Sequence, residues 1–176
     1  MKLLESFVRR VLQEESSSHS VKEVNEELQY LIQQDSGIIA VTLYADDGWE
    51  QIGKMDSHWY PMSKIQKNSC YEDILKLGGG KDPSETVLGV YDSRIENPQY
   101  RGKGYGRAMY EATIHEAFAA HGPFFFVPME CTGAGTTTSD ALRVWSSLSR
   151  DFPSSGKVIY VNRQPTVVGV VPLQKN

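Results

Sequence analysis

The segment FFFVPME, at residues 124–130, constrains the fold of this chain more than any other part of the sequence. Its apolar side chains follow one another, whereas a strand with one face in water alternates apolar and polar residues. Neither face of a strand built from this segment can therefore face solvent. We predict that residues 124–130 form a central strand buried on both faces.

The segments at the start of the chain predict two helices and then a hairpin. Apolar residues at helical spacing predict an amphipathic helix over residues 2–14. Ser20 and Glu23 match a capping box for a second helix, so residues 1–35 are predicted to form an N-terminal helical pair. The apolar stripe of the second helix consists of Val21, Val24, Leu28, Leu31 and Ile32. The β-branched run after Gly37, interrupted by an Asp-Asp-Gly turn, predicts a hairpin.

Residues 58–85 are the least regular part of the sequence, and we interpret them as an insertion. They contain YEDILKL, which predicts a short helix, and GGGKDPS, which predicts a loop. Residues 85–95 are predicted to be extended, and a helix is predicted from Tyr105 to about Ala120.

The segments after the buried strand predict a helix and a second hairpin. The polar loop CTGAGTTTS precedes a helix with one apolar face, which carries Ala141, Val144, Trp145, Leu148 and Phe152. The final segments KVIYV and TVVGVVPL predict a C-terminal hairpin. Because the sequence contains neither internal repeats nor a low-complexity linker, we predict a single α/β domain over residues 1–176.

The composition argues against two classes of partner. Of the 176 residues, 40% are hydrophobic and 23% are charged, as in an ordinary globular protein. The formal net charge is −4, whereas a protein whose main partner is nucleic acid presents a basic face. No segment approaches the ~18 apolar residues of a membrane span. We therefore expect neither nucleic acid nor a membrane as partner.

Cysteine and histidine usage predicts an intracellular protein without a metal. Cys70 and Cys131 are too few for a disulfide framework and have no metal-site spacing, which favours a reducing, cytoplasmic location. The N-terminal segment is interrupted by Glu5, Arg9 and Arg10, so it does not match a signal peptide. The four histidines are scattered, and we expect no metal ion.

The segment PQYRGKGYGR, at residues 98–107, places three glycines at alternate positions among cations. A Walker A loop requires a Lys-Ser or Lys-Thr pair after its last glycine, and a dinucleotide fingerprint requires G-x-G-x-x-G; neither spacing is present. Two interpretations remain. The segment is either a tight turn between a strand and a helix, or a loop whose bare backbone amides and helix N-terminus bind a pyrophosphate.

The surrounding sequence resembles a known family. NPQYRGKGYGRAMYEA, at residues 97–112, closely resembles the acyl-CoA-binding motif of the GNAT superfamily of N-acyltransferases. Arg101, Gly104 and Gly106 match the R/Q-x-x-G-x-G/A core of that motif. The resemblance is carried by residues 85–152.

The later helix continues the resemblance. The family has a helix with N-x-x-A-x-x-x-Y followed by a closing phenylalanine, and TSDALRVWSSLSRDF is similar to it. Ala141 matches the alanine of that pattern, and Phe152 matches the closing phenylalanine.

The resemblance implies a fold and a cosubstrate. The implied fold is α/β (α+β), with a central mixed sheet that is splayed between its fourth and fifth strands and flanked by helices. The implied cosubstrate is acetyl-CoA, whose pantetheine arm lies in the splay and whose pyrophosphate lies on the glycine loop. The residues that the resemblance assigns to cofactor binding are Arg94, Ile95, Glu96, Arg101, Gly102, Lys103, Gly104, Tyr105, Gly106, Arg107, Thr138 and Trp145.

Two residues depart from the family pattern where the chemistry takes place. Trp145 replaces a tyrosine that can protonate the leaving thiolate, and an indole N–H donates hydrogen bonds without acting as an acid. Thr138 replaces the asparagine at the start of the same helix. Glu130 is the preferred catalytic base, because it ends the strand that lines the splay; Glu85 and Glu96 are alternatives.

The sequence therefore predicts an acetyl-CoA-dependent N-acetyltransferase that acts on a primary amine. The acceptor is undetermined and includes lysine, protein N-termini, polyamines and amino sugars. The alternative is a catalytically inactive GNAT-fold protein that binds acyl-CoA or serves as an interaction module. GNAT domains frequently pair through their C-terminal strands, which implies that the VVGVVPL segment is the edge of a homodimer.

Overall fold

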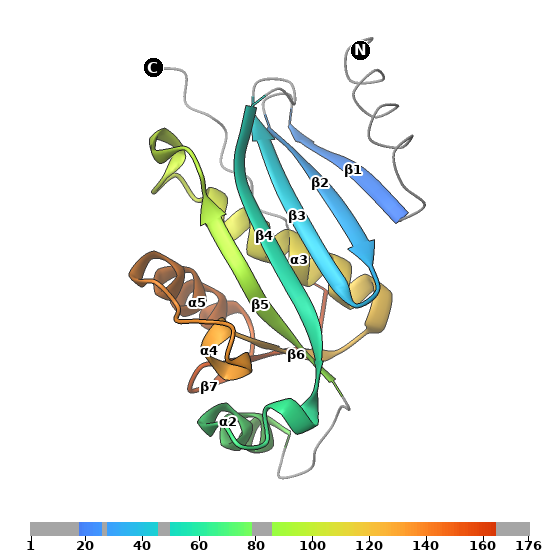
Figure 1. Ribbon diagram of the computed structural model, residues 1–176, viewed down its shortest axis with the longest axis vertical. Coiled ribbons are helices and arrows are strands. Elements are labelled where there is room, and N and C mark those ends of the chain that lie inside the picture. Colours follow the sequence, from blue (N-terminus) through green and yellow to red (C-terminus); the bar gives the residue numbers. More distant parts are fainter. Residues whose placement is uncertain (1–17, 26–27, 46–49, 79–85, 165–176) are drawn as a thin grey trace.

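The computed structural model describes residues 18–25, 28–45, 50–78 and 86–164 of the chain. They form an α+β domain around a mixed sheet of eight strands in the order β1-β2-β3-β4-β5-β6-β8-β7 (Figure 1). The strands are β1 (Ser18–Asn25), β2 (Leu28–Asp35), β3 (Ile38–Ala45), β4 (Glu50–Pro61), β5 (Thr86–Ile95), β6 (Phe124–Val127), β7 (Ser154–Ser155) and β8 (Val158–Val161). Neighbouring strands are antiparallel except for β5 and β6, which are parallel.

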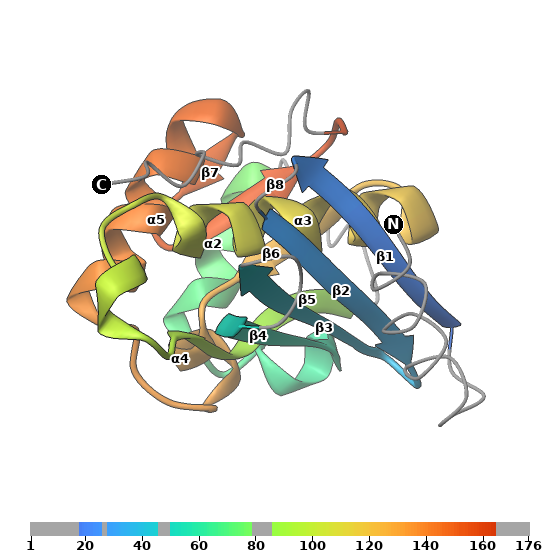
Figure 2. The ribbon, with the colours of Figure 1, turned by 90° about the horizontal axis from the view of Figure 1, so that it is seen from above.

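Helices cover both faces of the sheet. They are α2 (Ser69–Leu77), α3 (Tyr105–His121), α4 (Met129–Thr132) and α5 (Ser139–Asp151), with short 3₁₀ turns η1 (Met62–Lys64) and η2 (Pro98–Tyr100). Figure 2 shows α3 and α5 on one side of the strands and α4 on the other. Two apolar clusters fill the interior, one beneath α3 and α5 and one beneath α2.

The buried central strand is confirmed for residues 124–127. All four residues of β6 are buried. Phe124 and Phe126 belong to the cluster beneath α3 and α5, whereas Phe125 and Val127 belong to the cluster beneath α2. Because successive side chains point to opposite faces, a strand with helices on both faces needs the unbroken apolar run that the sequence has.

The second predicted helix of the N-terminal pair is wrong. Residues 18–25 and 28–35 form the strands β1 and β2, which pair with each other, and β2 pairs with β3. Ser36 and Gly37 link β2 to β3 with φ angles of 39° and 91°, the positive values of a two-residue hairpin turn. This turn lets β2 pair locally with β3, and the resulting ladder overrides the helical spacing of the apolar residues. The predicted helix over residues 2–14 lies outside the described residues.

Several other predicted elements agree with the structure. The hairpin after Gly37 is β3 and β4, the YEDILKL helix is α2, the extended segment is β5, and the helix from Tyr105 is α3. The KVIYV segment forms β8, which pairs with β6 and β7. The GGGKDPS loop from residue 79 onward and the TVVGVVPL strand lie outside the described residues.

The parallel pairing of β5 with β6 is confined to the start of β5. It consists of the pairs Leu88–Phe126 and Gly89–Val127. Directly afterwards Tyr91 is an extra residue in β5, because Val90 pairs with Ser57 whereas Asp92 pairs with Asp56. Such a bulge bends a strand and increases its twist. The second half of β5 therefore separates from β6, as Figure 1 shows.

The two cysteines form a disulfide, which the reducing location favoured by the sequence did not lead us to expect. Cys70, in α2, and Cys131, in α4, are 61 residues apart in the sequence, with Cα atoms separated by 5.7 Å. Asn68 adds a second link at the same place, since its Nδ2 donates to the Glu130 carbonyl at 3.0 Å. The spacing of two cysteines in a sequence does not reveal that two helices dock, so the pairing could not be predicted.

We predict that reduction of the Cys70–Cys131 bond lowers the free energy of unfolding by about 2–4 kcal/mol, because the bond closes a long loop in the unfolded chain. Urea unfolding with and without dithiothreitol measures this difference. A variant with both cysteines replaced by serine should unfold identically under both conditions. Equal stability of the oxidised and reduced wild-type protein would contradict the prediction.

Candidate functional site

The glycine loop joins β5 to α3 in a conformation that depends on glycine. Gly102 and Gly104 have φ angles of 73° and 88°, values that residues with a side chain rarely adopt. Gly104 is the N-cap of α3, and its carbonyl accepts from Ala108 N at 3.1 Å. Because the opening amides of a helix have no partner within it, the positive end of the α3 dipole lies at this loop.

Neither the backbone conformation nor the packing around Gly106 requires a glycine at this position. It lies in the first turn of α3 and does not have a positive φ. A Cβ added to it would contact Val144 Cγ2 at 3.9 Å, an ordinary van der Waals distance. Glycine inside a helix is less stable than alanine by about 0.5–1 kcal/mol. Close approach of a ligand to the backbone is a reason for glycine at this position.

The loop is held against the sheet by the Glu50 carboxylate at the start of β4. Its Oε1 accepts from Asn97 Nδ2 and its Oε2 from the Tyr100 hydroxyl, both at 2.7 Å. The hydrogen bond to Glu50, assisted by burial, raises the pKa of Tyr100 to about 12. Tyr100 is therefore neutral at physiological pH and remains a hydrogen-bond donor.

Arg101 and Lys103 place exposed positive charge on the loop. The Arg101 Nε and Nη2 atoms each lie 3.4 Å from the Ile95 carbonyl oxygen, at the end of β5. The Lys103 ammonium lies 5.7 Å from the centre of the Tyr100 ring. Neither cation forms an ion pair with a described carboxylate, so both can accompany an anionic ligand.

Arg107 differs from these two cations, because it joins α3 to α5. Its Nε donates to Glu111 on the same helix at 2.7 Å. Its Nη atoms donate to Ser147 and Asp151 on α5. The guanidinium is therefore engaged between the helices, and the structure gives no support to the predicted contact of Arg107 with phosphate.

The end of β5, which was predicted to bind pantetheine, carries charges that pair locally. Arg94 forms ion pairs with Asp92 at 3.4 Å and Glu96 at 3.3 Å. The Glu96 backbone amide donates to the Ile52 carbonyl of β4 at 2.9 Å. This amide therefore faces β4 and not the opening toward β6.

A small cavity of about 20 Å³ lies beside the second half of β5. Thr138 is the N-cap of α5, and its hydroxyl accepts from Ala141 N at 3.3 Å. Trp145 is 7% exposed, and its Nε1 has no hydrogen-bond partner among the described residues. The side chains around this cavity are those of Val90, Ser93, Tyr110, Met129, Thr137, Thr138, Ala141 and Trp145.

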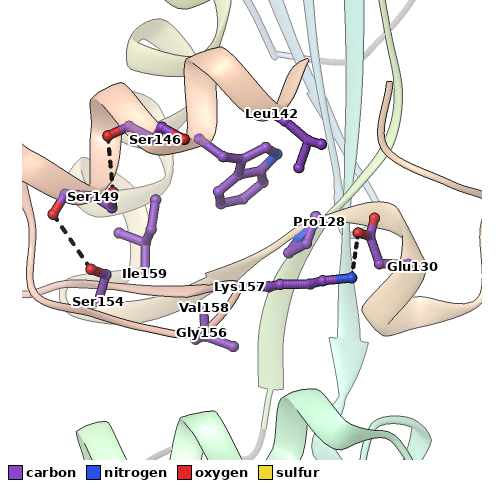
Figure 3. A pocket seen from close by; sticks show the side chains of 11 residues that line it. Pro128, Glu130, Leu142, Ser146, Ser149, Ser154, Gly156, Lys157, Val158 and Ile159 are labelled. Atoms are coloured by element: carbon purple, nitrogen blue, oxygen red, sulfur yellow. Dashed lines mark hydrogen bonds and ion pairs between the residues drawn. The ribbon is translucent and has the colours of Figure 1, made fainter. Parts of the chain in front are cut away.

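A larger cavity of about 130 Å³ lies between α5 and the β7–β8 hairpin, with Glu130 at its edge (Figure 3). The Lys157 ammonium lies 2.9 Å from Glu130 Oε1, and the Thr137 hydroxyl donates to Oε2. Burial acts to raise the pKa of Glu130, but these hydrogen bonds outweigh it, and the pKa lies below its ordinary value. Glu130 is therefore ionised at neutral pH.

The position of Glu130 differs from the prediction. The strand ends at Val127, and Glu130 lies in the short helix α4. Pro128 ends the pairing, since proline has no amide hydrogen for a sheet. Glu85, an alternative base, lies outside the described residues.

Three side chains of the site were not identified from the sequence. Glu50 reaches it through hydrogen bonds to Asn97 and Tyr100, and Ser93 through the pairing of β5 with β4. Contacts between distant segments leave no local signal in the sequence. Tyr110 had a signal, because it follows Gly106 by four residues and so shares a face of α3 with it. Tyr105, by contrast, is buried with 1% exposure, so only its backbone is available to a ligand at the loop.

Comparisons of the chain with protein-family models, curated proteins and solved structures find no match. Within the described ranges, no helix is long and apolar enough to cross a membrane. In the same part of the chain, no three His, Cys, Asp or Glu side chains are grouped so that they could hold a metal ion. The function is therefore inferred from the loop and the two cavities.

We predict that Tyr100→Phe lowers the free energy of unfolding by about 1–2 kcal/mol at pH 8, because it removes a hydrogen bond to a carboxylate. The pKa of Tyr100 is raised from 10.0 to about 12 on folding. Its contribution is therefore complete below pH 10 and is lost as the pH rises toward 12. Urea unfolding of both proteins at pH 8 and pH 11 should show the difference shrinking.

The control for this experiment is Tyr91→Phe. Tyr91 is 52% exposed, so removal of its hydroxyl should change the free energy of unfolding by less than about 0.5 kcal/mol. A Tyr100→Phe protein as stable as the wild type at pH 8 would contradict the role given to Glu50.

Proposed function

We propose that this protein is an N-acyltransferase that transfers an acetyl group from acetyl-CoA to a primary amine by direct attack. Gly106 carries the proposal. A glycine that neither backbone conformation nor packing requires lies in the first helical turn, beside two glycines with positive φ. Two nearby cations, Arg101 and Lys103, form no ion pair with a described carboxylate. A pyrophosphate on the exposed amides of this turn accounts for all of these features.

The proposed fold is that of the GNAT superfamily, and the sheet topology supports it. Antiparallel strands lead to β5, a parallel neighbour separates from β5 after two residue pairs, and a bulge at Tyr91 bends β5 at that point. The implied sheet is splayed between a strand that precedes the glycine loop and one that follows its helix, which corresponds to β5 and β6 here. The N-terminal part differs from the prediction, because strands at residues 18–25 and 28–35 replace the second predicted helix.

In this proposal each part of the site has one task. The amides from Gly102 to Gly106 bind the pyrophosphate, and Arg101 and Lys103 balance its charge. The pantetheine arm lies along the end of β5, where the backbone of Arg94 and Ile95 is available. Thr138 and Trp145 lie near the thioester.

Glu130 remains the proposed base. An ionised carboxylate can hold the ammonium form of an acceptor and receive its proton. In the free protein the Glu130 carboxylate forms an ion pair with Lys157. The ammonium group of an acceptor would take the place of the Lys157 ammonium, so the carboxylate would keep a cationic partner. The low pKa of Glu130 makes it a weak base, and most of the rate enhancement would come from orientation.

The alternative is a protein that binds acyl-CoA without turning it over. Two observations favour it. Trp145 stands where the family pattern has a tyrosine, and the Glu130 carboxylate already accepts hydrogen bonds from Lys157 and Thr137. Turnover with any amine would exclude this alternative.

The partners, the oligomeric state and the cellular location are also proposals. We propose acyl-CoA and an amine as the partners, with neither nucleic acid nor a membrane; the edge of the proposed homodimer lies outside the described residues. We retain a cytoplasmic location as a proposal, although disulfides such as Cys70–Cys131 persist mainly in oxidising compartments. Titration of free thiols in protein taken directly from cells distinguishes the two settings.

We predict that Gly106→Glu preserves or raises the free energy of unfolding, by about 0.5–1 kcal/mol, since it removes a helical glycine and places a carboxylate at a helix N-terminus. The same change should weaken CoA binding by roughly tenfold or more, because the new charge repels the pyrophosphate. Thermal unfolding and calorimetric titration with acetyl-CoA measure the two effects. Since they run in opposite directions, loss of binding cannot be attributed to unfolding.

Gly106→Gln is the matched control, because it adds the same bulk without the charge. It should weaken binding less than Gly106→Glu. Wild-type affinity in the glutamate variant would contradict the role of the loop. Absence of binding by the wild-type protein at millimolar acetyl-CoA would exclude the proposed function.

The pH profile tests Glu130 as the base. Its pKa lies below the ordinary 4.5, so Glu130 stays ionised from pH 5 to 8, whereas a primary amine with a pKa of about 10.4 is mostly protonated. The reactive pair, ionised Glu130 and the ammonium form of the acceptor, therefore predominates over the whole range, and we predict that log kcat/KM is nearly independent of pH from 5 to 8. Glu130→Gln should lower kcat/KM by roughly a hundredfold at neutral pH and give a slope of one, because the amine must then lose its proton to solvent before it binds. A slope of one in the wild-type protein would contradict the role of Glu130 as the base.

A further inference from the structure

Trp145 places a buried hydrogen-bond donor at the small cavity beside β5. Its side chain is 7% exposed, and its Nε1 has neither solvent contact nor a partner within the described part of the chain. A buried donor without a partner is costly, and native structures rarely contain one without a reason. The indole N–H therefore calls for an acceptor that is not part of the described structure.

The direction of this N–H follows from its neighbours. Trp145 lines both cavities, whereas Tyr110 lines only the small one. Burial raises the pKa of Tyr110, whereas polar contacts of its hydroxyl with Ser93 and with Trp145 act to lower it, so the indole N–H lies near this hydroxyl. The contact with Trp145 does not have the geometry of a hydrogen bond, because Nε1 has no partner that meets it among the described residues. The only polar group of an indole is Nε1–H, so this edge of the Trp145 ring faces Tyr110 and the small cavity. The two rings meet edge to face, with centroids 5.7 Å apart.

The small cavity has room for about one polar atom. Its volume is about 20 Å³, and a single water needs roughly 10–15 Å³ and two to four polar partners. Of the threonines beside it, Thr137 already donates to Glu130, and Thr138 caps α5. Among the buried side-chain nitrogen and oxygen atoms that have no partner in the described part of the chain, Trp145 Nε1 is the one that belongs to a residue lining this cavity.

We propose that Trp145 Nε1–H donates to the carbonyl oxygen of the acyl thioester, with that oxygen in the small cavity. This inference rests on the proposed function and names a catalytic residue for it. The cavity lies beside β5 beyond its pairing with β6, where the pantetheine arm is proposed to end. Because an indole keeps its proton, Trp145 acts as a hydrogen-bond donor and not as an acid.

The step balances without a further reagent. The amine nitrogen forms a bond to the carbonyl carbon, and the electron pair of the C=O bond moves to the oxygen that Trp145 binds. The C=O bond then re-forms, the C–S bond breaks, and CoA leaves as a thiolate. The amine proton passes to the base or to water. A fixed donor at the oxygen stabilises the charge that develops there.

A comparison of acetyl-CoA with S-ethyl-CoA tests the contact, because the thioether has no carbonyl. In the wild-type protein, acetyl-CoA should bind more tightly by roughly two- to tenfold, the contribution of one hydrogen bond. In Trp145→Phe the two affinities should become equal. Trp59→Phe is the matched control, since Trp59 packs against His121 and Phe124 on another part of the sheet; it should retain the wild-type ratio.

The outcomes separate this inference from the proposed function. Binding of both compounds with a ratio that survives in Trp145→Phe, or with equal affinities in the wild type, overturns the role of Trp145 and leaves the acyltransferase proposal intact. Failure of the wild-type protein to bind either compound overturns both.

A second measurement applies if Trp145→Phe does not fold. The chain has three tryptophans, so Trp49→Phe and Trp59→Phe identify the Trp145 indole signal in ¹⁵N NMR spectra by elimination. This signal should shift when acetyl-CoA is added and remain nearly unchanged with S-ethyl-CoA. Identical responses to the two compounds overturn the inference.

Discussion

The short parallel pairing of β5 and β6 is the constraint on which the site depends. Two residue pairs join the strands, and β5 then bends away at its Tyr91 bulge. Aromatic side chains fill the space beside the opening. Tyr110 packs edge to face against Phe126 and against Trp145. The ring centroids of Phe126 and Trp145 are 4.9 Å apart. Because rings cannot replace backbone hydrogen bonds, the second half of β5 keeps a side that an extended ligand can pair with.

The two helices beside the opening are joined by charge. Arg107 of α3 binds Glu111 and also reaches Ser147 and Asp151 of α5. Glu111 is 6% exposed, and a buried carboxylate needs a cation more than a surface one does. This requirement takes Arg107 away from the phosphate loop. Arg101 and Lys103, which form no ion pair with a described carboxylate, and the backbone amides of the loop would then bind the proposed anion, which raises the importance of the bare backbone at Gly106.

The sequence predicted the elements that have a strong local pattern and missed those set by distant pairing. The β6 run, the α3 helix and the glycine loop each carry their signal within a few residues, and all three were identified. The sequence predicts a helix in the second part of residues 1–35, because apolar residues there occur at helical spacing. The structure has strands at residues 18–25 and 28–35, because the turn at Ser36 and Gly37 pairs β2 with β3. Glu50, Ser93 and the Cys70–Cys131 bond join the site or the core through contacts between remote segments, and no local pattern records such contacts.

In the proposed acyl transfer, Trp145 in place of the tyrosine acid of the GNAT pattern would affect the easier half of the reaction. A thiol has a pKa of about 8.5, so a leaving thiolate near pH 7 takes its proton from water at little cost. A primary amine with a pKa of about 10.4 must lose a proton at a cost of about 4–5 kcal/mol at the same pH. Deprotonation of the acceptor therefore limits such a site more than protonation of the thiolate does. Under the proposal, a protein that keeps Glu130 ionised beside the larger cavity and has an indole N–H in place of the tyrosine hydroxyl would lose the less demanding function and would gain a donor for the acyl oxygen.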